Sequence, residues 1–112
     1  MLPSRPIELR EFVDERGRSP FARWFRALDP TAAAKVTIAL ARLEQGNLTS
    51  LKSVGGGVLE CRIDWGPGYR LYLGRDGDRL IILLAGGTKR RQEADIVSAH
   101  ERWSTYRRGK GI

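Results

Sequence analysis

Three consecutive strand patterns between residues 58 and 85 constrain the fold of this chain more than any other feature. Val58 to Trp65 alternates cleanly between apolar and polar side chains, as a strand with one buried face does. A Gly-Pro-Gly turn leads to a second alternating segment, Tyr69 to Gly74, and an Asp-Gly turn signal follows it. The third segment, Leu80 to Ala85, is apolar at every position, which is typical of a strand buried on both faces. Short turns between such segments predict an antiparallel sheet.

Two helices are predicted before these strands. Ser19-Pro20 and Asp29-Pro30 each place a capping side chain directly before a proline, which is a start signal for a helix. Gly46-Asn47 ends the second helix, and almost no loop separates the two, so they form a helical hairpin whose apolar faces need a sheet to cover. The apolar stripes at helical spacing are Phe21, Trp24, Phe25 and Leu28, then Ala33, Val36, Leu40 and Leu43.

The two ends of the chain add one strand and one helix. Ile7 to Val13 alternates at first and predicts an N-terminal strand. Gly86-Gly87-Thr88 is expected to break the last strand of the sheet, and a final helix begins at Lys89, with a basic, frayed tail from residue 107. We therefore expect one α+β domain over residues 1–112, with a small twisted, mostly antiparallel sheet in the order strand-helix-helix-strand-strand-strand-helix.

Composition excludes several kinds of site. With one cysteine, Cys61, and one histidine, His100, the chain can form neither an internal disulfide nor a two-histidine metal site, so we expect no metal and no cofactor. Both residues lie on apolar stripes, which favours packing over catalysis. No apolar run approaches the roughly 18 residues of a membrane span, and the first ten residues lack the apolar core of a signal peptide. A cytoplasmic protein without a membrane partner is the simplest expectation.

The charge indicates a partner. Twenty Lys and Arg against 13 Asp and Glu give a net charge of +7. The excess lies in two stretches: residues 19–57 hold five basic and two acidic side chains, and residues 89–112 hold seven and three. A small basic domain suits a polyanion, most often a nucleic acid. The alternative is that the charge aids solubility or pairs with an acidic protein.

Two arginines on consecutive predicted strands form the most suggestive constellation. Arg62 and Arg70 occupy the polar faces of strands joined by a short turn, so they should lie close together and repel each other unless an anion lies between them. Tyr72 shares this face. The alternative is that Glu60 and Asp64 pair with the two arginines as ordinary cross-strand ion pairs. Alternation alone supports both interpretations equally.

A second basic group lies where the last strand meets the last helix. Lys89, Arg90 and Arg91 follow Gly86-Gly87-Thr88, whose glycines would let the backbone approach a phosphate closely. Lys52, in the loop that leads into the first of the three strands, is a further candidate for RNA binding. Three cations in the first turn of a helix interact unfavourably with the positive end of the helix dipole. An anion bound there would offset this cost. Surface pairing of these cations with acidic residues one turn on is the alternative.

Three motifs resemble one protein superfamily. The predicted order of elements, with Pro-Phe-x-x-Trp-Phe at residues 20–25, resembles the RelE/ParE superfamily of bacterial toxins. Residues 55–72, Gly-Gly-Gly-Val-Leu-Glu-Cys-Arg-Ile-Asp-Trp-Gly-Pro-Gly-Tyr-Arg-Leu-Tyr, are similar to the HigB-type branch called addiction module killer proteins, which are related to phage-encoded proteins. Residues 84–96 match the ending of that branch, Gly-Gly-x-Lys followed by Gln and Asp-Ile. The resemblance covers nearly the whole chain.

The resemblance implies the toxin of a type II toxin–antitoxin system, a metal-independent endoribonuclease that cleaves mRNA on the ribosome and so inhibits translation. Carried onto this sequence, Arg62 and Arg70 would bind the scissile phosphate and stabilise its transition state. Glu60 or Lys89 would be the general base, and Lys89 or Tyr72 the general acid. A helix-turn-helix antitoxin, mRNA and the ribosome would be the partners, with operator DNA bound through the antitoxin.

The chain departs from this pattern near its C-terminus. Better-studied relatives carry a histidine-tyrosine pair or a tyrosine there as acid or base, whereas here the histidine of that region, His100, lies on an apolar stripe. Tyr106 lies on the last helix and is not a candidate. Two alternatives therefore stay open, namely a ParE-like inhibitor of DNA gyrase and a non-catalytic module that acts with its antitoxin as a transcriptional co-repressor.

Overall fold

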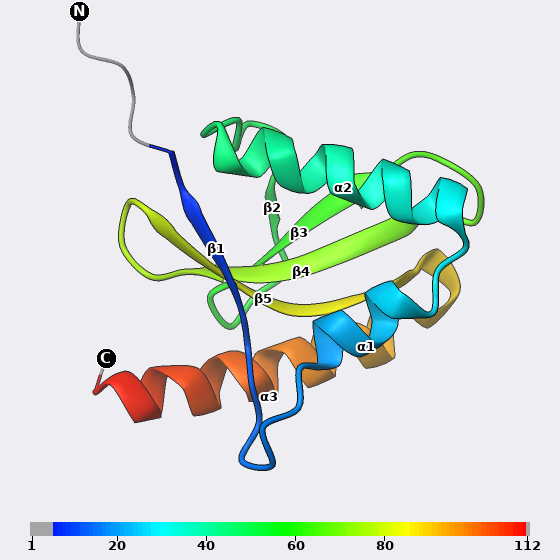
Figure 1. The fold of residues 1–112 in the computed structure, drawn as a ribbon. Helices are drawn as coiled ribbons and strands as arrows, with labels where there is room; N and C mark the ends of the chain where they lie inside the picture. Colours follow the sequence, from blue (N-terminus) through cyan, green and yellow to red (C-terminus); the bar gives the residue numbers. More distant parts are fainter. Residues whose placement is uncertain (1–5, 112) are drawn as a thin grey trace, which may run out of the picture.

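A computed structural model describes residues 6–111 and shows an α+β fold built on a five-stranded sheet (Figure 1). The strand order is β1-β5-β4-β3-β2, with β1 parallel to β5 and the other neighbours antiparallel, so the predicted fold class and mostly antiparallel sheet are confirmed. The elements in chain order are β1 (Glu8–Glu11), α1 (Pro20–Arg26), α2 (Pro30–Glu44), β2 (Lys52–Ser53), β3 (Val58–Ile63), β4 (Tyr69–Arg75), β5 (Leu80–Thr88), the 3-10 turn η1 (Lys89–Arg91) and α3 (Gln92–Lys110).

The helical hairpin begins where its capping residues predict. Ser19 Oγ accepts a hydrogen bond from the Ala22 backbone N–H at 3.0 Å, and Asp29 Oδ1 accepts one from the Ala32 N–H at 2.9 Å. Each cap satisfies an N–H group that has no partner within its helix, and the proline that follows loses nothing because its position needs no donor. On α2 it is Ala32, not the predicted Ala33, that joins the buried stripe.

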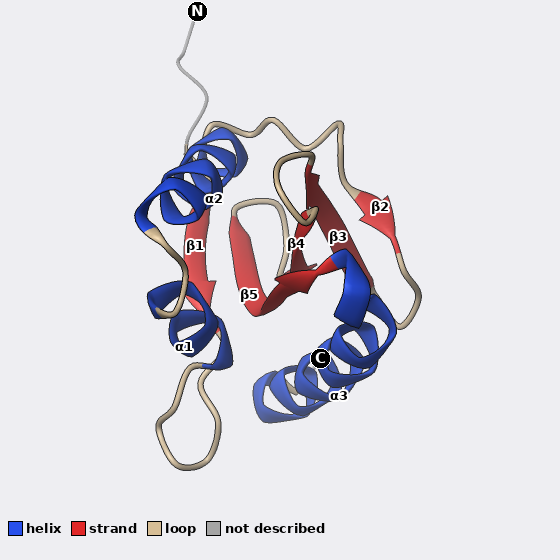
Figure 2. Cartoon of the chain, turned by 90° about the vertical axis from the view of Figure 1, so that its right-hand side faces the viewer, coloured by secondary structure: helices blue, strands red, loops and turns tan. Residues whose placement is uncertain are grey.

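The helices cover both faces of the sheet. Figure 2 shows α3 on one side of the sheet and the hairpin of α1 and α2 on the other. The hairpin face is closed by Phe21, Val36, Leu43, Cys61, Leu71, Leu73, Ile81 and Leu83. The α3 face is closed by Phe12, Val58, Tyr72, Ile82, Leu84, Ala85, Ala99 and Trp103. The apolar run in β5 thus reflects burial on both faces, as predicted.

Cys61 and His100 are packing residues, as expected. Cys61 is buried in the hairpin face, and burial raises the pKa of its thiol, which makes it a poor nucleophile. His100 is half-buried, with its Nε2 3.0 Å from the Val54 carbonyl oxygen. No helix within residues 6–111 is long and apolar enough to cross a membrane.

The prediction that Gly86-Gly87-Thr88 breaks the last strand is wrong, because β5 continues through Thr88. A Cβ on Gly86 would lie 2.1 Å from Cε3 of Trp24, and one on Gly87 would lie 1.8 Å from Oδ2 of Asp95. The glycines therefore make room for side chains of α1 and α3 that pack on the strand.

The chain ends also differ from expectation. The first strand covers Glu8–Glu11 rather than residues 7–13, and α3 continues to Lys110, so the tail from residue 107 is helical rather than frayed. Contacts with Asp76, in the loop after β4, hold this end of α3, and Lys110 Nζ lies 3.9 Å from Asp76 Oδ2. Tyr106 stacks on Trp103, with ring centroids 5.3 Å apart, and its hydroxyl donates to Asp76 Oδ2 at 2.5 Å. Residues 1–5, which include part of the segment expected to lack a signal-peptide core, and residue 112 lie outside the described residues.

Candidate functional site

Arg62 and Arg70 lie close together, as the alternation predicts, and the structure shows that they are directly opposite each other in the pairing of β3 with β4. Both line a hollow of about 360 Å³ at the end of these strands, which we call the strand-end hollow. Its walls are residues 62–70, which include the whole turn between the strands, together with Lys89. The structure thus brings together the three cations that sequence reasoning placed at a phosphate.

Gly68 fixes Lys89 beside Arg70. Its carbonyl oxygen accepts the Lys89 backbone N–H at 2.9 Å and Arg70 Nη1 at 3.1 Å. Gly68 has a φ of +75°, a conformation that side chains with a Cβ rarely adopt, and a Cβ there would lie 3.6 Å from the Lys89 Cβ. The glycine turn between β3 and β4 therefore ties the end of β5 to the arginine pair.

The polar face is not uniformly exposed, and in this the expectation from alternation is wrong. Arg62 and Lys89 are exposed, but Arg70, Glu60 and Tyr72 keep only 4%, 2% and 0% of their surface. The reason is α3, which packs over β4 and β5 on this face. The face therefore has an open end, at the strand-end hollow, and a covered part beneath α3.

Glu60 and Arg70 form a buried ion pair. Arg70 Nε lies 3.7 Å from Glu60 Oε2, and Gln92 Nε2 on α3 donates to the same carboxylate oxygen at 2.8 Å. The interpretation as a cross-strand ion pair is thus confirmed for Glu60 and Arg70. It does not extend to Arg62, which has no carboxylate within 4.0 Å among residues 6–111. Glu60 balances the charge of Arg70, although Arg70 Nε has no hydrogen-bond partner among the described residues.

Tyr72 lies deeper still. Its hydroxyl oxygen is buried and has no hydrogen-bond partner among the described residues. Burial raises the pKa of this phenol strongly, and the charge of Glu60 raises it further. A general acid must reach the leaving oxygen of the substrate. The buried Tyr72 hydroxyl is not placed to do so, whereas Lys89, the other candidate for the acid on sequence grounds, lines the hollow.

The strand-end hollow is electropositive where it is open. Arg62, Arg70 and Lys89 line it against one carboxylate, Asp64, and Glu60 balances only Arg70. Arginine and lysine side chains around a small hollow suit an anion the size of a phosphate. Among residues 6–111 no three His, Cys, Asp or Glu side chains gather as a metal site requires.

The three residues predicted to bind RNA lie around the hollow rather than in it. Arg90 and Arg91 are exposed in η1, the 3-10 turn that follows the end of β5. They directly precede the first turn of α3, with Arg91 as its N-cap residue, so they still lie at the positive end of the helix dipole. Lys52 is exposed in β2, a strand where the sequence predicted a loop, and is paired in register with Glu60.

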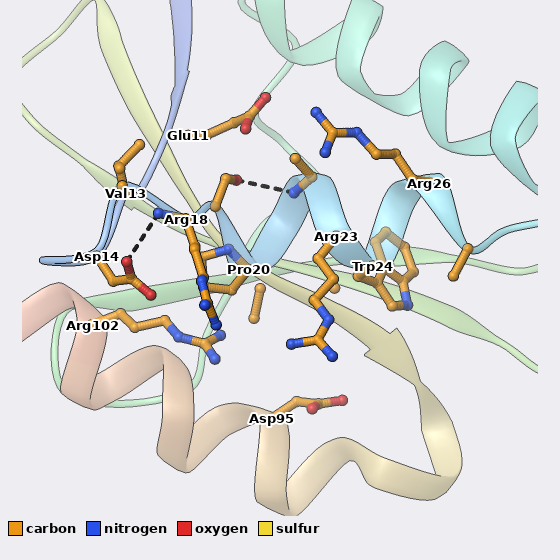
Figure 3. A pocket seen from close by; sticks show the side chains of 16 residues that line it. Glu11, Val13, Asp14, Arg18, Pro20, Arg23, Trp24, Arg26, Asp95 and Arg102 are labelled. Carbon is orange, nitrogen blue, oxygen red and sulfur yellow. Dashed lines mark hydrogen bonds between the residues drawn. The ribbon is translucent and has the colours of Figure 1, made fainter.

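The largest hollow, about 1000 Å³, lies elsewhere and contains none of the predicted residues. It is bounded by the loop after β1, α1 and α3, with Ala85 and Gly86 of β5 among its lining residues. Figure 3 shows Arg18, Arg23 and Arg102 extending into the space between α1 and α3, with Asp95 on α3. Sequence reasoning missed this hollow, although Asp95 and Arg102 are seven residues apart, on one face of a helix.

The carboxyl group of Asp95 predicts how the stability of the fold depends on pH. Burial raises the pKa of its carboxyl group above the ordinary value, and its Oδ2 has no hydrogen-bond partner among the described residues. A carboxyl group with a raised pKa stabilises the fold below its ordinary pKa and loses that contribution as the pH rises through the folded value. We expect Asp95→Asn to raise the melting temperature slightly at pH 7, with the difference shrinking toward about pH 4. A lower melting temperature at pH 7 would mean that attraction to Arg102 outweighs burial.

Comparisons with known proteins define the class. The fold matches the E. coli toxin RelE in the free state, a variant with two arginine-to-alanine substitutions, with a TM-score of 0.66. The match covers 87% of this chain and 97% of that one, at 19% identity. The fold is therefore that of RelE, and the RelE-like fold predicted from the sequence is confirmed.

The family follows from the sequence comparisons. The profile of the phage-derived protein Gp49-like family (DUF891) matches residues 23–104, and the chain belongs to this family. An uncharacterized protein of Haemophilus influenzae is 44% identical over 80 residues, which cover 70% of this chain and 81% of that protein. The matched residues include the whole strand-end hollow.

Proposed function

We propose that this protein is the toxin of a type II toxin–antitoxin system, of the HigB type, and that it cleaves mRNA on the ribosome. The observation that carries the proposal is the strand-end hollow, where Arg62, Arg70 and Lys89 converge at the end of the sheet. The net charge of +7 and the RelE-type fold support it. A toxin of this kind would act in the cytoplasm.

The reaction we propose needs no metal. The 2′-hydroxyl of one nucleotide attacks the adjacent phosphorus, a 2′,3′-cyclic phosphate forms, and the bond to the 5′-oxygen of the next nucleotide breaks. Arg62 and Arg70 bind the phosphate oxygens, on which negative charge grows in the transition state. Lys89 donates a proton to the leaving 5′-oxygen, and the 2′-hydroxyl loses its proton to a general base.

The residue that acts as general base is less obvious than the general acid. Glu60 was the carboxylate predicted from sequence, but Arg70 and Gln92 hold it beneath α3. Asp64 is exposed and lines the strand-end hollow beside Arg62. We propose that Asp64 accepts the proton of the 2′-hydroxyl and that Glu60 positions Arg70. Sequence reasoning had considered Asp64 only as a partner for an arginine.

An antitoxin follows from the proposed toxin role. We propose a helix-turn-helix antitoxin as the partner that silences this protein, with operator DNA bound through that antitoxin. The exposed cations Lys52, Arg90 and Arg91 are proposed contacts to ribosomal RNA or mRNA. Arg90 and Arg91 directly follow Lys89, Lys52 pairs in register with Glu60, and all three are free of carboxylate partners among residues 6–111. Such contacts should weaken as the salt concentration rises.

Induced expression without an antitoxin tests the class of activity. We expect growth to stop, with incorporation of labelled amino acids falling before that of thymidine. Arg62→Ala with Lys89→Ala serves as the matched inactive control. Collapse of DNA synthesis and supercoiling while mRNA stays intact would replace this proposal with gyrase inhibition. Unchanged growth would replace it with a co-repressor role.

A further inference from the structure

A second hollow adjoins the strand-end hollow. It measures about 480 Å³ and lies between α2, residues 47–50 and β3, and we call it the α2 hollow. The two hollows share residues 62–65, the end of β3 and the start of its turn. A ligand that binds Arg62 in one hollow can therefore extend into the other without leaving the protein surface.

The edge of the sheet is open where the hollows meet. The two-residue strand β2 pairs only with Leu59 and Glu60 of β3. From Cys61 to Ile63 the outer edge of β3 has no neighbouring strand among residues 6–111. An extended chain could thus cross this edge from the strand-end hollow to the α2 hollow.

Trp65 offers a rigid aromatic surface at this crossing. It is partly exposed and lines both hollows. It stacks with Tyr69 at an interplanar angle of 18° and a centroid distance of 6.1 Å. Tyr69 is buried and meets Trp24 edge-on, and Trp24 is the ring that packs against Gly86. This chain of aromatic contacts ties Trp65 to the core, so a base stacking on it would not have to order it first.

Cations and hydrogen-bonding groups surround the indole ring. Lys35 Nζ lies over the ring, 6.0 Å from its centroid, and Arg42 and Arg62 also line the α2 hollow. Neither Lys35 nor Arg42 has a carboxylate within 4.0 Å among residues 6–111. The amide and hydroxyl side chains of the lining are those of Asn47, Thr49 and Ser50.

We propose that the α2 hollow binds the nucleotide next to the cleaved phosphate of single-stranded RNA. Its base stacks on Trp65 in place of the Lys35 ammonium group, while Lys35 and Arg42 contact the flanking phosphates. A stacking ring beside backbone-binding cations is the usual arrangement for single-stranded nucleic acids, whereas an acidic peptide would need the cations alone. The proposal rests on the proposed function, because it assumes that the phosphate bound by Arg62 belongs to RNA.

Binding of an RNA that cannot be cleaved tests this subsite apart from catalysis. The probe is a fluorescent 2′-O-methyl single-stranded hexanucleotide, titrated with the full chain at low salt and followed by anisotropy. We expect Trp65→Ala to weaken binding roughly 5- to 100-fold, as loss of one stacked base does. Trp65→Phe should retain most of the affinity, since it keeps an aromatic face. Arg42→Gln should weaken binding and reduce its salt dependence.

Arg108→Gln is the matched control, because Arg108 is exposed near the end of α3 and lines neither hollow. Equal affinities of wild type and Trp65→Ala would overturn the subsite, as would absence of binding by wild type up to about 1 mM. Trp65-dependent binding of a poly-glutamate peptide in place of the RNA would overturn it in favour of a protein partner. Trp65-dependent RNA binding without cleavage on ribosomes would leave the subsite standing and contradict the proposed nuclease.

Discussion

Arg62→Ala and Lys89→Ala are each expected to reduce mRNA cleavage at least about 100-fold while the melting temperature stays nearly unchanged. Both side chains are exposed, line the strand-end hollow and have no ion-pair partner among residues 6–111, so their removal leaves no buried charge behind. Removal of either side chain raises the free energy of the transition state, in which charge develops on the phosphate and on the leaving oxygen.

Cleavage rates on programmed ribosomes, measured together with thermal unfolding, check this expectation. Arg108→Ala is the control, since it removes an equal charge from the far end of α3. A cleavage rate of the Lys89 variant equal to that of wild type would show that Lys89 takes no part in the reaction. The proposed nuclease would then rest on the two arginines alone. A large drop in melting temperature would show that these residues hold the fold instead.

Arg70→Ala is expected to behave differently, with a loss of about 3–5 kcal/mol in the free energy of unfolding. Its guanidinium is buried beside Glu60, and truncation would leave that carboxylate without a counter-charge beneath α3. Loss of toxicity in this variant alone would therefore say little about catalysis.

A second variant separates the two effects. Arg70→Met with Glu60→Gln removes both charges and keeps an amide near Gln92, so most of the stability should return. Cleavage should stay absent because the phosphate ligand is missing. Urea unfolding gives the stability and ribosome assays give the activity. Restored cleavage in the stable double variant would show that Arg70 only supports the sheet.

Local signals predicted much of the fold. The caps at Ser19 and Asp29, the β3–β4 turn and the shared face of Arg62 and Arg70 all follow from short-range sequence, because capping, turn chemistry and alternation act over a few residues. The strand β2 was missed, since two residues are too few to show alternation. The Gly86-Gly87 pair was taken as a strand break because only the tertiary contacts with Trp24 and Asp95 show why glycine is there.

The sequence predicted which cations gather at the site, but not which side chains around them are buried. Alternation placed Arg62 and Arg70 close together on one face, yet it says nothing about what covers that face. Arg70 is buried by α3, which begins 22 residues later in the chain. For the same reason the sequence predicts reactive roles for Glu60 and Tyr72, both of which are buried in the structure. Trp65 was assigned to the end of a strand, and its place between two hollows emerges only when α2 and the β3–β4 turn are brought together.

The most direct measurement is cleavage of a defined mRNA by the purified full chain. Ribosomes are programmed with the message, the A site is left empty, and the products are mapped and their ends identified. We expect cuts within the A-site codon, with 2′,3′-cyclic phosphate and 5′-hydroxyl ends, in the presence of a metal chelator at a concentration that leaves the ribosomes intact. Intact message after incubation with folded, antitoxin-free protein would contradict the proposed nuclease, as would cleavage that survives the removal of Arg62 and Lys89.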